Sequence, residues 1–532
     1  MSCLRTTAVI AAAVAGVLTA LAVPAPGGAH AQTIRLGLSS EPSSLDPQFS
    51  RTGNNQVVAD HLFDRLVHVD ANNQPVPGLA VSWLSVDHLT WVVRLRPGVT
   101  FHDGKPFTAE DVVYSLDRIK TITGSPAPFT QNIGAIAKVE VVDPMTVRFT
   151  TKRPTPQFME QAGRVHIVSK AAIDGAKAED FTSGKAVVGT GPYRFASFSQ
   201  GQSLTLTRNE TYWGEKPAFT QATLRFVSND ASRVVALLAG ELDIVDQVPP
   251  AMLDRVRADP NYTVHSIGSL RIVYFGVDSA RDKSPFVTDL DGKPLETNPL
   301  RDPRVRLAIS KMINRKAIVE RLLAGSGEPA GQLVPEGLGG FAPDLRPVDF
   351  DPEGAKKLLA EAGWEKGFGL TVHASSDRIP RETEVAQAVG QMLNRGGIKV
   401  NGVVTQPYAT YATAAGKQEF SFFLFSFGTT TADAAGGITA VLATFDKDTG
   451  RGAFNRARYS NPAFDALLTK ALEEFDPTKR NALLADAQRV AFRDNGIIPL
   501  YWQVVHWAGR KDIAFMPSRT EDTLAMAARP AK

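Results

Sequence analysis

The stretch LRPGVTFHDGKPFTAEDVVYSLDR, residues Leu95–Arg118, brings a histidine and several acidic side chains close together. The pair Asp103-Gly104 is typical of a tight turn, because glycine accepts positive φ and aspartate bonds to the nearby backbone. Thr108 has an acidic residue three positions later and an apolar run beyond it, which is the pattern of a helix N-cap. His102 has no second histidine at the spacing of a metal site. The stretch therefore predicts a strand end, a turn and a capped helix, and no catalytic centre.

The rest of the chain alternates strand and helix patterns, which predicts a mixed α/β fold. Residues 33–40 and 89–101 alternate apolar and polar side chains, as half-buried strands do. Residues 420–427, FSFFLFSF, form an apolar run that suits a buried strand in a covered sheet. Several helices are expected to begin at an acid or amide followed by proline, because proline at the first helical position loses no hydrogen bond. These pairs are Asp302-Pro303, Asp351-Pro352 and Asn461-Pro462.

The N-terminal segment differs from the rest of the chain in composition. Arg5 is its only charged residue, residues 8–23 are apolar, and the small-x-small triplet Ala29-His30-Ala31 follows. A charged start, a short apolar core and such a triplet are typical of an export signal peptide, so we expect cleavage near Ala31. The apolar stretch is shorter than the roughly 20 residues of a membrane span. We therefore expect a soluble exported protein.

Composition and motifs exclude several classes of function. The chain of 532 residues has 58 basic and 55 acidic side chains, so its net charge of +3 supports neither nucleic-acid nor membrane-surface binding. Cys3, the single cysteine, lies within the predicted signal, which leaves no disulfide and no thiol nucleophile. No phosphate-binding loop, nucleophile elbow, His-Glu-x-x-His or dinucleotide fingerprint occurs. We predict no catalytic residue, no metal site and no cofactor. A secreted hydrolase whose carboxylates come from distant segments stays open as an alternative.

Six segments together resemble the extracytoplasmic solute-binding proteins of family 5, the peptide-, nickel- and opine-type receptors of ABC importers. The resemblance covers essentially the whole chain after the signal, in the family's order. The segments are Leu95–Arg118, GTGPYRF (Gly189–Phe195) with RNETYWGEKP (Arg208–Pro217), DPRVRLAISKMINRKAI (Asp302–Ile318), YSNPAFDALLTKAL (Tyr459–Leu472) and IIPLYWQ (Ile497–Gln503).

The resemblance implies a two-lobed α/β periplasmic-binding-protein fold, class II-like and of cluster C. An extra subdomain is inserted in the N-terminal lobe, and two segments cross between the lobes. Carried onto this chain, lobe I is expected at 32–75, 188–278 and 503–532, the inserted subdomain at 76–187, and lobe II at 279–502.

The resemblance also implies a function that involves no chemistry on the ligand. A monomeric receptor in the periplasm captures a small peptide-like or acidic solute between two closing lobes and delivers it to ABC transporter permease subunits in the inner membrane. No enzyme activity and no cofactor are expected. A nickel or metallophore receptor of the same family is the alternative within this class.

The family's ammonium anchor is altered in this chain. In its peptide receptors an aspartate soon after a Gly-Trp pair holds the peptide ammonium, and the matching stretch here is Ser426–Asp433. Phe427 stands at the position of the tryptophan and Thr430 at that of the aspartate. A hydroxyl replaces a carboxylate poorly beside a buried ammonium. Asp433, three residues after Thr430, is the alternative anchor, and capping the next helix is the other role that its position predicts.

Arginines at other matching positions favour a ligand with an acidic group. Arg378 lies near the position where dipeptide receptors hold the peptide carboxylate, and its guanidinium offers two parallel donors to a carboxylate or phosphate. A surface or interlobe salt bridge is the alternative role for it. Arg51 falls where some peptide receptors carry an acid. The weaker candidate contacts are the polar Asn54, Asn455 and Gln503 and the stacking aromatics Tyr408 and Phe427.

Overall fold

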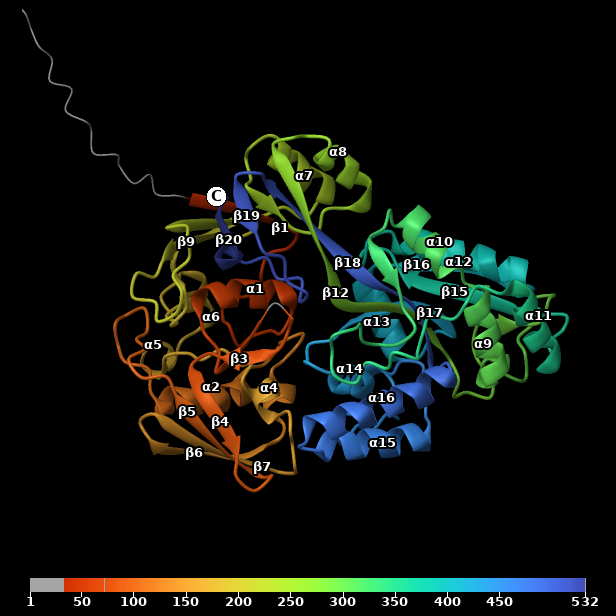
Figure 1. Cartoon of the computed structure of the whole chain (residues 1–532), viewed down its shortest axis with the longest axis horizontal. Helices are drawn as coiled ribbons and strands as arrows, with labels where there is room; N and C mark the ends of the chain where they lie inside the picture. The colour runs from red at the N-terminus through yellow and green to blue at the C-terminus, as the bar shows by residue number, and fades with distance from the viewer. Residues whose placement is uncertain (1–32, 71, 532) are drawn as a thin grey trace, which may run out of the picture.

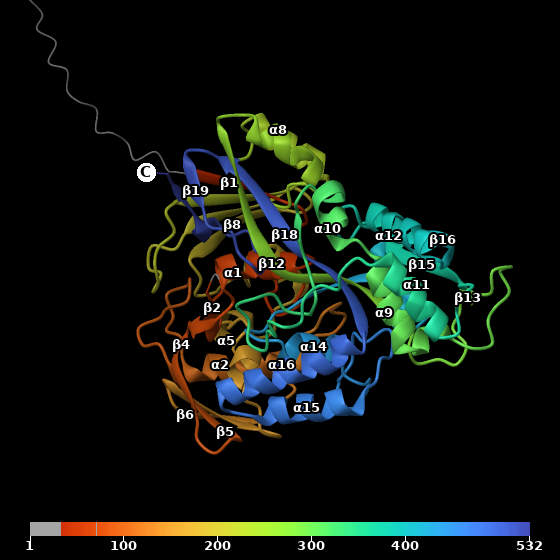
Figure 2. The same cartoon turned by 45° about the vertical axis from the view of Figure 1, so that its right-hand side comes forward.

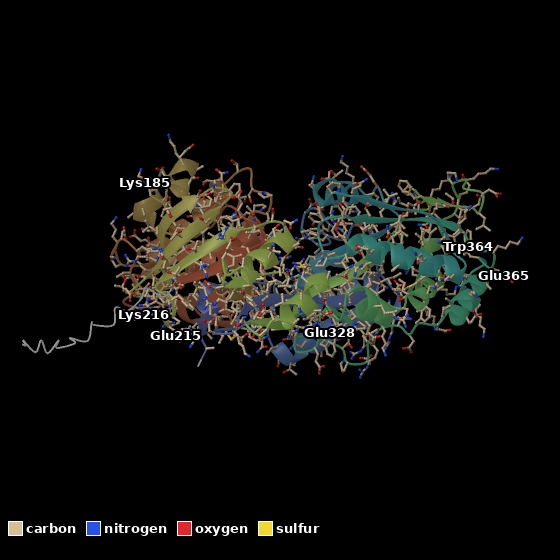
Figure 3. All side chains as sticks on the ribbon, turned by 90° about the horizontal axis from the view of Figure 1, so that it is seen from above. Lys185, Glu215, Lys216, Glu328, Trp364 and Glu365 are labelled. Carbon is tan, nitrogen blue, oxygen red and sulfur yellow. The ribbon has the colours of Figure 1, made fainter. Side chains whose placement is uncertain are left out.

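The chain folds into two α/β lobes, shown by a computed structural model that describes residues 33–70 and 72–531 (Figure 1). The predicted signal peptide, residues 1–31, lies outside this range. Figure 3, seen from above, places Lys185 and Lys216 at one end of the long axis and Trp364 at the other. Within the described ranges no helix is long and apolar enough to cross a membrane.

One large mixed sheet continues through both lobes. Its hydrogen-bonded order is β13-β15-β17-β12-β18-β11-β1-β10-β9-β8, with β16 on β15 and β14 on β18. The strands are β1 (Thr33–Leu38), β8 (Tyr193–Ser199), β9 (Ser203–Arg208), β10 (Gln221–Phe226), β11 (Ile244–Val245), β12 (Tyr262–Val277), β13 (Val287–Thr288), β14 (Gly327–Pro329), β15 (Gly369–Ser375), β16 (Lys399–Gln406), β17 (Phe422–Gly428) and β18 (Ile497–Arg510).

The long antiparallel strands β12 and β18 are the two segments that cross between the lobes (Figures 1 and 2). Their pairing is irregular between Gly268 and Ile272, and such an irregularity bends a strand. Beyond it, residues 271–277 pair with β17 of lobe II. The predicted boundary of lobe I at residue 278 stays a prediction.

The remaining strands form three small sheets. The first is a four-stranded antiparallel sheet of order β4-β5-β7-β6, from β4 (Ala80–Ser85), β5 (Thr90–Leu95), β6 (Ile136–Asp143) and β7 (Thr146–Thr151). The other two are the pairs β2 (Val67–Val69) with β3 (Pro75–Pro77) and β19 (Ile513–Phe515) with β20 (Ala528–Pro530). Figure 1 shows the four-stranded sheet with α2 at the lower left, below the rest of lobe I.

Helices cover both faces of the lobe II sheet and build separate cores. Phe422 and Leu424 of β17 pack into the core with α9, α11 and α12, whereas Phe423 and Phe425 pack into the core with α13–α16. This alternation confirms the buried strand predicted for residues 420–427. The helices are α1 (Gly53–Leu62), α2 (Ala109–Arg118), α3 (Thr130–Ile133), α4 (Phe158–Ala162), α5 (Lys170–Ile173), α6 (Ala178–Thr182), α7 (Asp230–Leu238), α8 (Leu253–Arg257), α9 (Pro303–Met312), α10 (Arg315–Ala317), α11 (Pro352–Glu361), α12 (Glu382–Gly396), α13 (Tyr408–Gly416), α14 (Ala435–Val441), α15 (Pro462–Glu473) and α16 (Pro477–Arg493).

The stretch Leu95–Arg118 folds as its local pattern predicts. Gly104 turns at φ +86°, and Thr108 and Asp111 form the capping box of α2. His102 is held between backbone groups, since its Nε2 contacts the carbonyl oxygen of Gly191 at 3.1 Å. Burial lowers the pKa of His102 to about 4, which keeps the ring neutral. The predicted structural roles of this stretch are confirmed.

The helix starts predicted at acid-proline or amide-proline pairs are also confirmed. The side chains of Asp302, Asp351 and Asn461 each accept a hydrogen bond from the first turn of α9, α11 and α15, and proline follows each of them. A side-chain cap of this kind contributes about 1 kcal/mol to a helix.

Candidate ligand-binding cleft

A cleft with a volume of about 1430 Å³ lies between the lobes. On the lobe II side it meets the carboxyl ends of the parallel strands β15 and β17, where their loops carry Arg378 and residues 427–431. The carboxyl ends of parallel strands are the usual ligand position in open α/β sheets. On the lobe I side the loop after β1 contributes Arg51. The sheet topology thus brings loops from both lobes to one cavity.

The loop after β15 is fixed by two acidic side chains that hold Arg378 in place. Glu382 Oε1 accepts hydrogen bonds from the backbone N–H of Arg378 and the hydroxyl of Ser375, both at 2.7 Å. Asp377 accepts from the backbone N–H of Tyr408 at 2.7 Å. The Arg378 guanidinium lies 5.2 Å from the Tyr408 ring, which is a cation–π distance.

The Arg378 side chain is solvent-exposed within the cleft and has no carboxylate partner among the described residues. Although the side chain is open to solvent, partial desolvation between the cleft walls and the charge of Arg271 lower its pKa. Arg271, by contrast, binds Glu521 through two parallel contacts of 3.0 and 3.1 Å, and this carboxylate raises the pKa of Arg271. One arginine of this wall is therefore neutralised, and the other is available to an anion.

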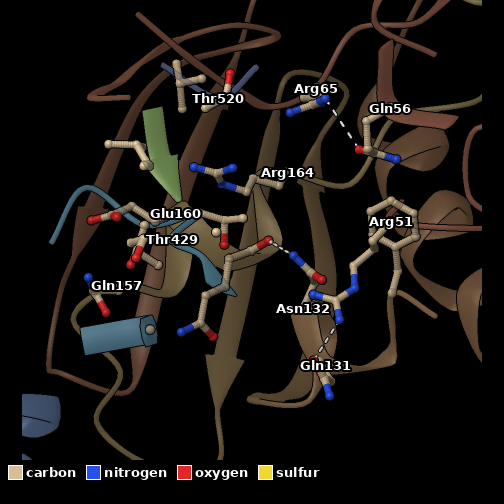
Figure 4. Close-up of a pocket in the computed structure, with 18 of the residues that line it drawn as sticks. Arg51, Gln56, Arg65, Gln131, Asn132, Gln157, Glu160, Arg164, Thr429 and Thr520 are labelled. Atoms are coloured by element: carbon tan, nitrogen blue, oxygen red, sulfur yellow. Dashed lines mark hydrogen bonds between the residues drawn. The ribbon is translucent and has the colours of Figure 1, made fainter. Parts of the chain in front are cut away.

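The lobe I wall is rich in polar side chains, many of them already paired (Figure 4). Arg51 donates from Nη2 to Gln131 Oε1 at 2.7 Å, while its buried Nε has no hydrogen-bond partner in the described chain. Asp60 forms an ion pair with Arg65 and contacts the buried His166, whose Nε2 lies 2.7 Å away. Although burial opposes ionisation, these two groups lower the pKa of Asp60. Arg51 thus retains an unused donor, whereas Asp60 is fully engaged.

Several contacts already join the two sides of the cleft. Asn73 donates from Nδ2 to the carbonyl oxygen of Thr431 at 2.9 Å. Glu160 accepts from the backbone N–H of Ala432 at 3.3 Å. The Phe475 ring, after α15, stacks on His88 of the inserted sheet with centroids 4.3 Å apart. The two lobes are therefore in direct contact at these positions, beside the cavity that separates them elsewhere.

Four of the side chains proposed from the sequence line the cleft: Arg51, Arg378, Phe427 and Thr430. Phe427 meets Phe454 edge to face, with centroids 5.6 Å apart, and Thr430 is exposed to the cavity. Tyr408 does not line the cavity directly and reaches it only through its contact with Arg378. Whether any of these side chains touches the ligand stays a prediction.

The other proposed residues lie away from this cavity. Asp433 is buried, accepts from the Ala435 N–H at 2.9 Å at the start of α14, and pairs with Arg480 at 3.2 Å. Asn54 donates to the carbonyl oxygen of Glu41, and buried Asn455 holds its own loop through carbonyl groups. Gln503, on crossing strand β18, lines a separate small cavity.

Sequence reasoning missed the cleft residues in and just after α4 and those of the C-terminal segment. Glu160, Arg164, Glu521 and Asp522 all line the cavity, but no local motif marks them. Burial, together with the charge of Asp60, raises the pKa of Asp522 to about 6. Within residues 33–70 and 72–531, no group of three or more His, Cys, Asp or Glu side chains is arranged to hold a metal ion.

Two lobes, two crossing strands and a polar cleft at strand ends define a two-lobed solute-binding protein. Residues 74–449 match the family model described as bacterial extracellular solute-binding proteins, family 5. The chain belongs to this family, as its motifs indicated.

Named relatives align over nearly the whole chain. The probable D,D-dipeptide-binding periplasmic protein DdpA of Escherichia coli K12 is 27% identical over 492 residues, 90% of each chain. The glutathione-binding protein GsiB of the same strain is 28% identical over 496 residues, 91% of each chain. Both are binding proteins by name.

Solved structures show the same architecture. HbpA2 from Haemophilus parasuis superposes with a TM-score of 0.79 at 23% identity, covering 94% of this chain and 100% of the other. A dipeptide-binding protein from Pseudoalteromonas sp. SM9913, in complex with Met-Leu, superposes with a TM-score of 0.77 at 25% identity and the same coverage. The predicted two-lobed fold is confirmed.

Proposed function

We propose that this chain is the periplasmic receptor of an ABC importer for a small peptide-like solute that carries an acidic group. The solute binds between the lobes, the lobes close, and the closed form delivers it chemically unaltered to permease subunits in the inner membrane. Closure is stabilised only by as much as the ligand prefers the closed form over the open one. The bend of β12 between Gly268 and Ile272 supports a hinge there.

The observation that carries this proposal is the unpaired guanidinium of Arg378. A cation held in a cleft without a carboxylate partner is stabilised by an anionic ligand, and a guanidinium binds a carboxylate through two parallel hydrogen bonds. The loop that presents Arg378 is held by Glu382 and Asp377, so the backbone that carries the guanidinium is already positioned before the ligand arrives. Arg51, which lines the facing wall and has no carboxylate partner among the described residues, adds a second cation to the cavity.

Size and relatives favour a peptide-like solute over a smaller acid. The cavity of about 1430 Å³ exceeds the volume of roughly 300–1,000 Å³ of most small-molecule sites. The relatives that align with about nine-tenths of the chain are named for binding a D,D-dipeptide and glutathione. Both are short peptides that end in carboxylates.

Calorimetric titration of the purified protein with glutathione and with D-alanyl-D-alanine tests this proposal. We expect wild type to bind at least one of them, and Arg378→Ala to weaken that binding by about 1.5–3 kcal/mol, the value of a charged hydrogen bond. Arg395→Ala is the matched control, because Arg395 is exposed on α12, which follows the same loop. Its affinity should equal that of wild type.

Two outcomes would overturn the proposal. One is a product in place of the intact peptide when the titrated mixture is analysed by chromatography. The other is binding of a nickel–histidine complex with no binding of either peptide.

A further inference from the structure

A loop near the C-terminus, residues 516–524, reaches from lobe I to the bend of the crossing strand β12, and we call this loop the strap. Both of its ends are fixed in lobe I. The flanking residues Phe515 and Ala525 pack in the core that contains β1. Within the strap, Thr523 Oγ1 accepts a hydrogen bond from the indole N–H of Trp507 at 2.8 Å. The strap therefore moves with lobe I.

The strap meets β12 in the interval where that strand changes partners. Up to Gly268 the strand pairs with β18 alone, and residues 271–277 pair with β17 of lobe II. Between them, the backbone N–H of Leu270 donates to the carbonyl oxygen of Arg519 in the strap at 3.1 Å. The Leu270 carbonyl oxygen accepts from the N–H of Thr429, in the loop after β17, at 2.9 Å. Leu270 is thus held by lobe I through the strap and by lobe II through that loop.

Side chains of the strap contact β12 on both sides of the bend. Before it, Arg519 Nε donates to the carbonyl oxygen of Gly268 at 3.3 Å. After it, Glu521 accepts two hydrogen bonds from the Arg271 guanidinium, at 3.0 and 3.1 Å. Arg271 is paired through its backbone with Gly428 of β17. The Arg271–Glu521 ion pair therefore joins a lobe I loop to the lobe II half of the strand.

The backbone of Glu521 is strained where it makes this ion pair. Its φ is +70°, in the left-handed region that residues other than glycine rarely adopt. Such a conformation persists only where the surrounding contacts compensate for it. The two hydrogen bonds to Arg271 are contacts of this kind, so the strained turn and the ion pair support one another.

We propose that the strap restrains the hinge, because the Arg271–Glu521 ion pair sets the angle between the lobes in the ligand-free protein. Rotation of one lobe about the bend carries Arg271 away from Glu521, and two parallel hydrogen bonds tolerate little change in geometry. Leaving the arrangement found here therefore costs the interaction energy of the pair. The proposal concerns the protein without ligand and does not depend on which solute the cleft binds.

A distance measured between the two lobes tests this proposal. Cys3, the single cysteine, lies in the predicted signal, so two introduced cysteines in the mature protein can be spin-labelled specifically. Lys138→Cys on β6 of the inserted sheet and Lys470→Cys on α15 of lobe II are suitable, because both side chains are exposed. Double electron–electron resonance without ligand then gives the distribution of distances between the labels.

Two variants of Glu521 are compared with a matched control in this labelled background. Glu521→Gln removes the charge and keeps an acceptor oxygen, whereas Glu521→Gly removes the side chain and accepts positive φ without strain. The control is Asp494→Asn, because the Arg306–Asp494 ion pair, at 2.7 Å, is also partly buried but lies within lobe II. Urea denaturation of each variant checks that it is folded.

We expect both Glu521 variants to broaden the distance distribution. The ratio of molecules outside the wild-type peak to those inside it should rise by roughly 10-fold or more, the factor expected for one charged hydrogen bond. Asp494→Asn should keep the wild-type distribution. Unchanged distributions in both Glu521 variants would overturn the proposal. Equal broadening in Asp494→Asn would also overturn it, because the effect would then follow from the loss of any ion pair.

Discussion

Arg271 and Arg378 line the same wall of the cleft, yet their surroundings differ completely. Arg271, on crossing strand β12, donates two hydrogen bonds to Glu521, and each of these side chains is less than a fifth exposed. Arg378, on the loop after β15, has its backbone fixed by Glu382 while its guanidinium has no carboxylate partner in the described part of the chain. Glu521 therefore neutralises the charge of Arg271, whereas Glu382 fixes the backbone of Arg378.

The contrast teaches that the residue type alone does not distinguish a structural arginine from one available to a ligand. Glu521 reaches Arg271 from 250 residues away in sequence. The Arg271–Glu521 pair also joins a crossing strand to the C-terminal segment, next to the bend between the lobes. Both arginines are positively charged, and the presence of a carboxylate partner distinguishes the structural Arg271 from Arg378.

The largest effect is expected from breaking the paired arginine. Arg271→Ala leaves Glu521 largely buried without a cation, and should lower the free energy of unfolding by about 2–3 kcal/mol, somewhat less than a fully buried pair loses. Arg378→Ala breaks no ion pair and should change the free energy of unfolding by less than about 0.5 kcal/mol. Urea denaturation of both variants without ligand measures the difference. Equal losses would remove the distinction between the two arginines.

A smaller effect is expected from releasing the loop that carries Arg378. Glu382→Ala removes the acceptor of the Ser375 hydroxyl and the Arg378 N–H, so peptide affinity should fall by about 1 kcal/mol. Glu382→Gln keeps an acceptor oxygen, and because burial raises the pKa of Glu382, a neutral side chain suits this site. Its affinity should stay near that of wild type in calorimetric titration. If Glu382→Ala also weakens binding in the Arg378→Ala background, Glu382 does not act on affinity only by positioning Arg378.

The last prediction concerns the pH dependence of stability, through Asp522, the neighbour of Glu521. Burial and Asp60 raise its folded-state pKa to about 6, above the value of about 4 in an unfolded chain. Between these values the folded chain holds a proton that the unfolded chain has released, so this group stabilises the fold below pH about 4 and the contribution is lost as the pH rises through 6. Asp522→Asn should therefore show a smaller fall in unfolding free energy from pH 4 to 6, measured by urea denaturation across that window. Identical slopes would show that Asp522 ionises normally.

Local patterns in the sequence predicted the elements because the groups involved are neighbours along the chain. The turn at Asp103-Gly104 and the caps at Asp302 and Asn461 each depend on atoms within a few residues. The predicted division into lobes and inserted subdomain, and the proposed ligand contacts, stay predictions.

The sequence by itself determined the α/β elements, their capped ends and, through its motifs, the family. Only the tertiary structure decided which charged side chains pair with one another and which line the cavity without a charged partner. Glu160 meets Ala432, and Glu521 meets Arg271, across hundreds of residues. The physical reason is that an ion pair depends on distance in space, and distance in space between remote segments is set by how the lobes and their crossing strands pack.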